Sequence, residues 1–396
     1  MSNELDLSYP RFSDAEYQRR YNAVRQGMEK RGLDCLIVFG DSGHSRFNMA
    51  NVHYLSNYVD QMWAYVVFPL DGEPTLFTTL FSHVLNAKLI SVFEDVRYGG
   101  PCPVQGVLDR IKELKLDKGR IGLVGVHSYR KISMPQEHFE MLRQEFPHAH
   151  FEHVTDLIEN IRLIKSDEEI EALEKAAHYS DIAMEALVQK CKPGSTDHEL
   201  QAAIMCSYLA DGGVYHFHLI GSTPMADPIM PYPWPFPGNR TLKKGDVVMT
   251  EISAGYNYYS GQVIRTIFVE EEPLPVYQEL FKVAKEAHDG VAAALKPGNT
   301  EKDAIEAGMV ILNSGYKHHA SLVHGWGQNH EPPFIGLPGW PVRVTPITFQ
   351  PGMVLMIEPN PMTQDERYGV FLGNLHVVTE TGSRNLHSYP NELIVT

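Results

Sequence analysis

Strand-like and helical segments alternate along roughly the first 150 residues, and this alternation restricts the fold more than any other feature. Residues 13–32 have amphipathic helical spacing and open with the cap-like Ser13. Strand-like apolar runs follow, namely CLIVFG, AYVVFPL, PTLFTTL and RIGLVGV, with helical stretches at VQGVLDRIKELK and PQEHFEMLRQEF. Because such alternation is typical of a sheet covered by helices, we predict an α/β domain at residues 1–155.

The length of the chain, 396 residues, is too great for one ordinary hydrophobic core and predicts a second domain. A long helical region covers residues 156–190, and further helical stretches cover residues 276–295 and 300–315. The rest of this half reads as antiparallel strands separated by turns rich in glycine and proline. We therefore predict a domain of mixed α and β structure at residues 156–396.

Charge and cysteine content narrow the classes of function. The net charge of −15 argues against nucleic acid as a partner, because phosphate backbones require clustered Lys and Arg. We expect no membrane partner, because no apolar run reaches the ~18 residues that a span needs. The N-terminal segment lacks the basic and apolar regions of a signal peptide. Four scattered cysteines indicate reduced thiols, so we expect a cytoplasmic protein.

Segments of the second half carry the candidate chemistry. Residues 251–266, EISAGYNYYSGQVIRT, read as a β-hairpin. The others are HGWGQNHEPP at residues 324–333, PGMVLMIEPNP at residues 351–361 and GVFLGNLHVVTETG at residues 369–382. Together they hold histidines and carboxylates, the side chains used for acid–base catalysis and for metal binding.

In this order the segments resemble the motifs of the creatinase, aminopeptidase P and prolidase superfamily. Residues 162–173, RLIKSDEEIEAL, resemble the signature with which that superfamily opens its C-terminal domain. The resemblance implies an N-terminal creatinase-like α/β domain followed by a C-terminal pita-bread domain, in which helices flank a curved antiparallel sheet. It also implies a homodimer that acts on a small-molecule substrate.

The superfamily holds two metal ions at positions that here read Glu251, Gln262, His324, Glu358 and Gly373. Gln262 and Gly373 stand where the superfamily has acidic ligands, and position 373 has no side chain at all. Because two ions need enough carboxylates to bridge and neutralise them, we expect no metal cofactor. The alternative is a single divalent ion held by Glu251, His324 and Glu358, since two carboxylates and a histidine are reasonable ligands.

The lost ligands resemble the metal-free branch of the superfamily, which includes creatinase and ectoine hydrolase. The phrase EISA, which begins at Glu251, is similar to E-I-A-G of ectoine hydrolase. We therefore expect a hydrolase that cleaves a C–N bond in a small cationic or zwitterionic metabolite of amidine, guanidino or cyclic amidine type. One alternative is a metal-dependent Xaa-Pro aminopeptidase or dipeptidase with a mononuclear site. Another is an inactive relative that binds a small molecule.

The expected catalytic residues are Glu251, His324, Glu358 and His330. In this interpretation Glu251 acts as general base or nucleophile, and Glu358 with a histidine manages the leaving nitrogen. Creatinase has a catalytic histidine where this chain has Trp234, and His216 and His218, which alternate on one face of an apparent strand, are candidates to replace it. Aromatic side chains near the pocket can bind a cationic group. The expected substrate-binding residues are Trp234, Tyr256, Gln262, Trp326, His216 and His218.

Overall fold

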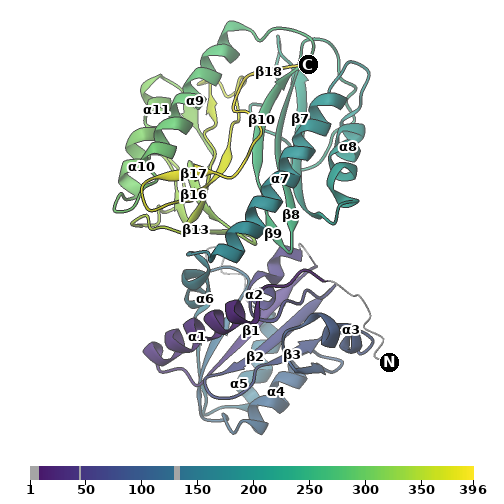
Figure 1. Ribbon diagram of the computed structural model, residues 1–396, viewed down its shortest axis with the longest axis vertical. Coiled ribbons are helices and arrows are strands. Elements are labelled where there is room, and N and C mark those ends of the chain that lie inside the picture. The colour runs from purple at the N-terminus through teal and green to yellow at the C-terminus, as the bar shows by residue number, and fades with distance from the viewer. Residues whose placement is uncertain (1–8, 44–45, 129–133) are drawn as a thin grey trace. The chain divides into compact units, whose positions relative to one another are not determined.

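The computed structural model describes residues 9–43, 46–128 and 134–396. The chain divides into two compact units, Met1–Arg162 and Leu163–Thr396, and each has its own sheets and helices (Figure 1). Across the described ranges, no helix is both long enough and apolar enough to cross a membrane.

A mixed sheet forms the centre of the N-terminal unit, in the order β4-β3-β2-β1-β5-β6. Its strands are β1 (Cys35–Asp41), β2 (Trp63–Pro69), β3 (Thr75–Thr78), β4 (Asp95–Tyr98), β5 (Arg120–Val124) and β6 (His150–His153). Strand β1 pairs antiparallel with β2 and parallel with β5. The apolar runs in the sequence correctly predicted β1, β2, β3 and β5, whereas the short and more polar β4 and β6 were not predicted.

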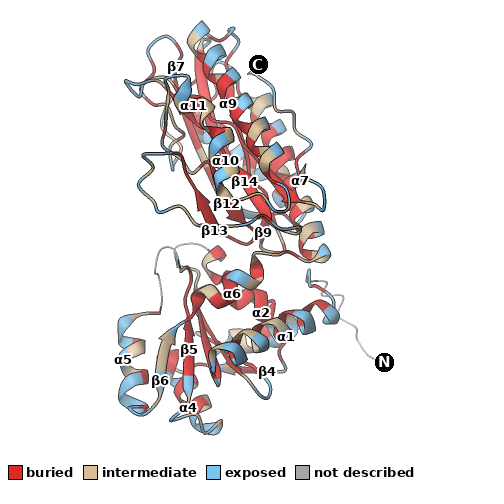
Figure 2. Ribbon diagram, turned by 90° about the vertical axis from the view of Figure 1, so that its left-hand side faces the viewer, coloured by how far each residue is buried: buried red, intermediate tan, exposed pale blue. Residues whose placement is uncertain are grey.

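Helices surround this sheet. They are α1 (Asp14–Arg31), α2 (Ala50–Ser56), α3 (His83–Ile90), α4 (Val104–Glu113), α5 (Gln136–Glu145) and α6 (Thr155–Arg162), with the short 3-10 helix η1 at Arg46–Met49. The helix predicted at residues 13–32 is α1, because Ser13 caps its first turn and Gly32 ends it with φ 65°. Val107 of α4 and Leu142 of α5 are buried in the core with residues of the central strands. Figure 2 shows β5 mostly buried, whereas the edge strand β6 and the outer helix faces are more exposed.

The C-terminal unit contains two larger sheets, which are antiparallel except where β10 pairs parallel with β18. Its helices are α7 (Asp167–Lys190), α8 (Asp197–Leu209), α9 (Pro275–Ala294), α10 (Glu301–Gly308) and α11 (Val310–Asn313). One sheet contains β18 (Ile394–Val395), β10 (Val263–Phe268), β8 (Asp246–Tyr256) and β7 (Val214–Pro224), with β9 (Tyr259–Ser260) paired to β8. The other contains β13 (His330–Ile335), β12 (Val323–Trp326), β14 (Val354–Ile357), β16 (Asn374–Val378) and β17 (Ser383–Asn385). Strands β11 (Lys317–His318) and β15 (Pro361–Met362) pair separately.

Helices flank both sheets of this unit, and a backbone bridge joins the sheets. In one core cluster Leu187 of α7 packs with Ile252 of β8, and in another Val291 of α9 packs with residues of β12 and β14. Ile264 of β10 bridges Gly373, the residue before β16. The candidate catalytic positions lie on the strands near this junction.

The helical region predicted at residues 156–190 is broken between α6 and α7. The Lys165 N–H donates to the Gly352 carbonyl oxygen, which takes the backbone out of the helix. Ser166 then starts α7 with a capping box that it forms with Glu169. Because of this break, α6 belongs to the N-terminal unit and α7 to the C-terminal unit.

Candidate active site

The hairpin of β8 and β10 places Glu251 and Gln262 side by side, as the sequence predicted. Glu251 lies on β8 opposite Ile264 of β10, and Gln262 directly precedes β10. Gln262 Nε2 donates a hydrogen bond of 2.5 Å to Glu251 Oε1. Both side chains are buried, and Gln262 Oε1 has no hydrogen-bond partner among the described residues. The amide therefore orients the carboxylate and leaves its own oxygen unpaired.

The turn of this hairpin fits closely against α7. A Cβ atom at Gly261 would lie 2.4 Å from the Ala176 carbonyl oxygen, which is too close for any side chain. The Gly261 N–H donates to the Ala254 carbonyl oxygen at 2.8 Å. Glycine is required here for close backbone approach, and the packing fixes the position of the neighbouring Gln262.

The second sheet contributes His324 from β12 and Glu358 from the end of β14. His324 Nδ1 lies 3.1 Å from the Gly325 carbonyl oxygen, which can only accept, so Nδ1 carries the ring proton. His324 Nε2 lies 3.4 Å from Glu358 Oε2, and among the described residues it has no hydrogen-bond partner. The Ser321 hydroxyl donates to Glu358 Oε1. A buried lone pair thus faces a carboxylate, an arrangement that favours a cation or a proton between them.

The buried carboxylate Glu251 is affected by the charge of Glu358. Burial, together with the negative charge of Glu358, raises the pKa of Glu251 well above its ordinary value of 4.5. Hydrogen bonds from Gln262 and Tyr232 oppose this shift. A positive ion at the site would also oppose it, because a cation favours the ionised carboxylates.

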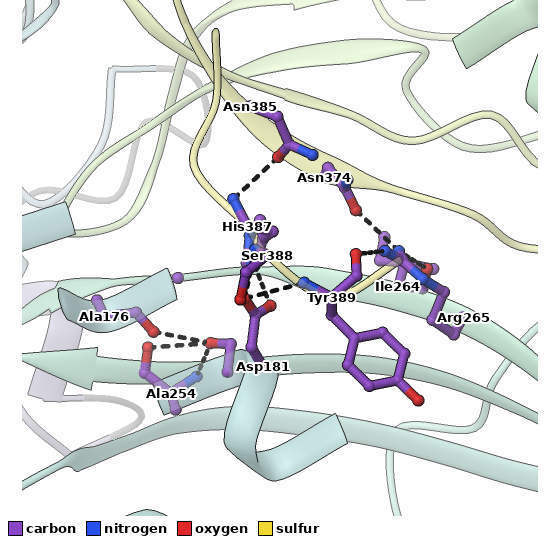
Figure 3. A network of polar contacts seen from close by, with 12 residues as sticks. Ala176, Asp181, Ala254, Ile264, Arg265, Asn374, Asn385, His387, Ser388 and Tyr389 are labelled. Carbon is purple, nitrogen blue, oxygen red and sulfur yellow. Dashed lines mark hydrogen bonds and ion pairs between the residues drawn. The ribbon is translucent and has the colours of Figure 1, made fainter. Parts of the chain in front are cut away.

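Position 373 has no room for a ligand side chain. A Cβ atom at Gly373 would lie 2.5 Å from Met356 Cε and 2.7 Å from the Ile357 carbonyl oxygen. Arg265 Nη1 fixes the local backbone, since it donates to the Gly373 carbonyl oxygen at 3.0 Å. It also donates to Asn374 Oδ1 at 2.8 Å (Figure 3). The buried guanidinium of Arg265 therefore stabilises this junction of the two sheets. Position 373 supplies no carboxylate ligand for a metal ion.

His216 and His218 lie in different surroundings, so the prediction that they share one face is wrong. A β-bulge interrupts the pairing of β7 with β8 at His216, and such an extra residue changes the alternation of side chains. His216 Nδ1 lies 2.9 Å from the Ser253 hydroxyl, and its ring lies 5.5 Å from that of Trp326. His218 Nε2 instead lies 2.7 Å from the Tyr208 hydroxyl of α8. Of the two, His216 is therefore the one beside the aromatic residues of the site.

Trp326 and His330 form an aromatic cluster with His324. The ring centroid of His324 lies 5.3 Å from that of Trp326 and 4.7 Å from that of His330. Trp326 is fully buried, and its Nε1 atom donates to the Ser260 carbonyl oxygen. These predicted residues therefore lie together, beside the ring of His324.

Trp234 and Tyr256 have other surroundings. Trp234 packs against the core cluster that includes Met225 and Met230. Tyr256 lies at the end of β8 with Lys175 Nζ 3.9 Å from its ring centroid, a cation–π contact with α7. A role of these two residues in substrate binding stays a prediction.

Residues to which the sequence interpretation gave no catalytic role also reach the site. The Tyr232 hydroxyl donates to Glu251 Oε2 at 3.5 Å. Burial, with the charges of Glu251 and Glu358, raises the pKa of Tyr232 well above its ordinary value of 10.0. Beside His330, Glu331 forms a buried ion pair of 3.0 Å with Lys165. Tyr232 lies two residues before Trp234, the position at which creatinase has a catalytic histidine. This closeness in sequence was the signal that could have indicated Tyr232.

Comparison with known proteins identifies the family. The family model described as "Metallopeptidase family M24" matches residues 171–380, which is more than half of the chain. The model "Creatinase/Prolidase N-terminal domain" matches residues 20–164. The chain belongs to metallopeptidase family M24. The superfamily and the fold predicted from the motifs are thereby confirmed.

Individual M24 relatives match nearly the whole chain. The Xaa-Pro dipeptidase of Pyrococcus furiosus is 27% identical over 381 residues, which cover 92% of this chain and 100% of that protein. An uncharacterized peptidase of Bacillus subtilis, YqhT, is 28% identical over 374 residues, with 92% and 96% covered. The solved prolidase of Pyrococcus horikoshii has a TM-score of 0.78 at 23% identity and covers 95% of this chain and 100% of that chain. The X-Pro aminopeptidase of Thermotoga maritima has a TM-score of 0.80 at 21% identity, with 95% and 99% covered.

These findings correct two expectations. The expected cleavage of a non-peptide C–N bond is wrong, because full-length relatives are Xaa-Pro dipeptidases. The expected absence of a metal cofactor is also wrong, because the matched family is one of metallopeptidases. The changes at positions 262 and 373 remove two acidic ligands, but this M24 chain keeps metal-binding donors at Glu251, His324 and Glu358.

The side-chain atoms that remain at the site are of the chemical types that bind one divalent ion. Carboxylate oxygens of Glu251 and Glu358, the bare Nε2 of His324 and the unpaired Oε1 of Gln262 are oxygen and nitrogen ligands of ordinary type. Position 373 cannot complete the ligands of a second ion. As the side chains lie, no three His, Cys, Asp or Glu groups of the described ranges are close enough to hold a metal. The fit therefore rests on unpaired donor atoms and not on a formed coordination sphere.

Proposed function

We propose that this M24 protein is a peptidase that cleaves Xaa-Pro dipeptides with one divalent ion held by Glu251, His324 and Glu358. The names and coverage of its relatives support the substrate class. The observation that carries the proposal is His324 Nε2, a buried nitrogen without a hydrogen bond among the described residues, 3.4 Å from a Glu358 oxygen. A divalent cation satisfies both atoms and offsets the repulsion between Glu251 and Glu358.

The side chains of the site have separate tasks in this proposal. The ion, when bound, supplies Lewis acidity for the peptide carbonyl and for water. Gln262 orients Glu251 through the hydrogen bond to its Oε1 atom, and Ser321 orients Glu358 in the same way. A carboxylate of the pair takes a proton from water and returns it to the leaving proline nitrogen. The fully buried Trp326 helps to exclude water, and the neighbouring His330, which is only half-buried, contacts the substrate.

The test is hydrolysis of Leu-Pro and Met-Pro, with Gly-Leu as a substrate that lacks proline. Protein loaded with Mn²⁺ is expected to cleave the proline dipeptides and to lose this activity in chelator. Glu358→Gln and Glu251→Gln are expected to lower kcat/KM at least about 100-fold, because each removes a charged ligand. Glu380→Gln is the matched control, since Glu380 is exposed on the same unit.

Two results would overturn the proposal. One is the absence of Xaa-Pro cleavage with every divalent ion tried, together with small-molecule binding, which would favour the inactive relative. The other is full activity after exhaustive removal of metal.

We further propose that the protein works as a homodimer in a reducing cytoplasm. The resemblance to superfamily members of this length supports the dimer. The four cysteines, all within the described residues and all free thiols, support the compartment. Light scattering coupled to size-exclusion chromatography is expected to give twice the chain mass of 44.7 kDa. A monomeric mass would refute the dimer.

A further inference from the structure

Tyr232 connects a surface pocket with the catalytic carboxylates. Its hydroxyl donates to Glu251 Oε2 at 3.5 Å, the long end of the hydrogen-bond range. Its ring packs against Phe371, with the centroids 4.8 Å apart. The preceding carbonyl oxygen, that of Pro231, accepts from Asn360 Nδ2 at 3.4 Å. The phenol is therefore held in place by its ring and backbone while the hydroxyl contact itself is weak.

Tyr232 also lines a pocket of about 310 Å³. Its walls are Pro231, Tyr232, His319, Ala320, Met362 and Glu366. Ala320 directly precedes Ser321, whose hydroxyl donates to Glu358. The pocket thus adjoins residues bonded to both carboxylates, and most of its wall is apolar. Such a wall suits an apolar side chain of a peptide, with Tyr232 at its edge as a polar group.

We propose that Tyr232 is a catalytic residue whose hydroxyl donates a hydrogen bond to the scissile carbonyl oxygen of a peptide bound in this pocket. The inference rests on the proposed peptidase function. No proton leaves the phenol in this step, and the donor simply turns from Glu251 to the substrate. Because its hydrogen bond to Glu251 is long, the Tyr232 hydroxyl loses little free energy when it leaves Glu251 for the substrate. The bond strengthens as the carbonyl oxygen gains negative charge, so it favours the transition state over the bound substrate.

The variant Tyr232→Phe tests the assignment, because it removes the hydroxyl and keeps the ring that packs on Phe371. With Leu-Pro as substrate we expect kcat to fall about 100-fold while KM stays nearly constant, as for other donors to a developing oxyanion. Tyr368→Phe is the matched control, since the Tyr368 hydroxyl donates to the Ala226 carbonyl oxygen at 3.5 Å instead. Its kcat is expected to stay within about twofold of the wild-type value.

A second replacement keeps the test decisive if the Phe variant folds poorly. Tyr232→4-aminophenylalanine retains a donor at the same place and is expected to keep at least a tenth of the wild-type kcat. Unchanged kcat in a folded Tyr232→Phe protein would overturn the inference, as would a rise in KM alone or loss of activity in the 4-aminophenylalanine protein. These outcomes leave the proposed function standing, because wild-type protein still cleaves Leu-Pro. An inactive wild-type protein refutes the proposed function itself.

Discussion

Gly373 forms the bridge to Ile264 that joins the two sheets, and the neighbouring residues leave no room there for a side chain. The atoms that a Cβ would meet include the Ile357 carbonyl oxygen, which cannot move aside as a flexible side chain does. The loss of a carboxylate at this position is therefore built into the packing of the sheet junction. A second ion cannot be restored here by changing one residue.

Gly373→Ala is expected to lower the free energy of unfolding by about 1–3 kcal/mol, because overpacking forces the backbone to shift. Gly382→Ala serves as the control, since a Cβ at Gly382 meets no atom within 4 Å. Its effect is expected to stay within about 0.5 kcal/mol. Urea unfolding followed by circular dichroism measures both. Equal stability of the two variants would contradict the account of the junction.

The carboxylate of Asp181, on α7, binds the C-terminal segment at residues 387–389. Asp181 accepts hydrogen bonds from His387 Nδ1 at 2.7 Å, from Ser388 N at 2.6 Å and from Tyr389 N at 3.2 Å (Figure 3). Burial opposes ionisation of this group, but the bonds from His387 and Ser388 prevail and lower the pKa of Asp181. Arg265 Nη2 binds the Tyr389 carbonyl oxygen as well, so the same segment supports the sheet junction.

Asp181→Ala is expected to cost about 3 kcal/mol of unfolding free energy, because it leaves several buried donors without an acceptor. Asp211→Ala, at an exposed aspartate of the same unit, is expected to cost about 0.5 kcal/mol or less. Hydrogen exchange should also show faster exchange at residues 387–396 in Asp181→Ala. Unaltered protection there would argue against the fastening role.

Elements with strong local signals could be predicted from the sequence, and those set by packing could not. The helix cap at Ser13 and the strand β1 each arise from residues that are adjacent in the sequence, namely a capping side chain and an apolar run. The sequence was therefore sufficient to predict both elements. The bulge at His216 and the break before Ser166 arise from pairing with distant strands. The neighbours Glu251, His324 and Glu358 followed from motifs, whereas Tyr232 comes from a loop without periodic pattern.

Across the whole molecule, buried neutral histidines make stability depend on pH. Burial lowers the pKa of His218 and His376 to about 3 and that of His318 to about 4, from an ordinary value of 6.5. In the unfolded chain these groups take up protons below about pH 6.5, whereas the folded chain stays unprotonated. Stability is therefore full above that pH and falls as the pH decreases. Glu251 acts in the opposite sense, because its pKa is raised in the fold.

We expect the free energy of unfolding to fall between pH 7 and pH 5. Each such histidine contributes a decrease of about 1.4 kcal/mol per pH unit once the pH is well below 6.5. The His376→Asn variant, whose amide can keep the bond to the Ser383 hydroxyl, should show a shallower dependence. Urea titrations at several pH values measure the slopes. A stability that rises on acidification would refute this reading of the buried histidines.

The most direct measurement for a mononuclear peptidase is a Mn²⁺ titration of metal-free protein, with Leu-Pro hydrolysis as the readout and protein well above the dissociation constant. The donors Glu251, His324 and Glu358, with Gly373 unable to contribute, predict that activity appears on addition of metal and reaches its plateau at one ion per chain. A plateau at two ions per chain, or the absence of activity at every Mn²⁺ concentration, would contradict this account.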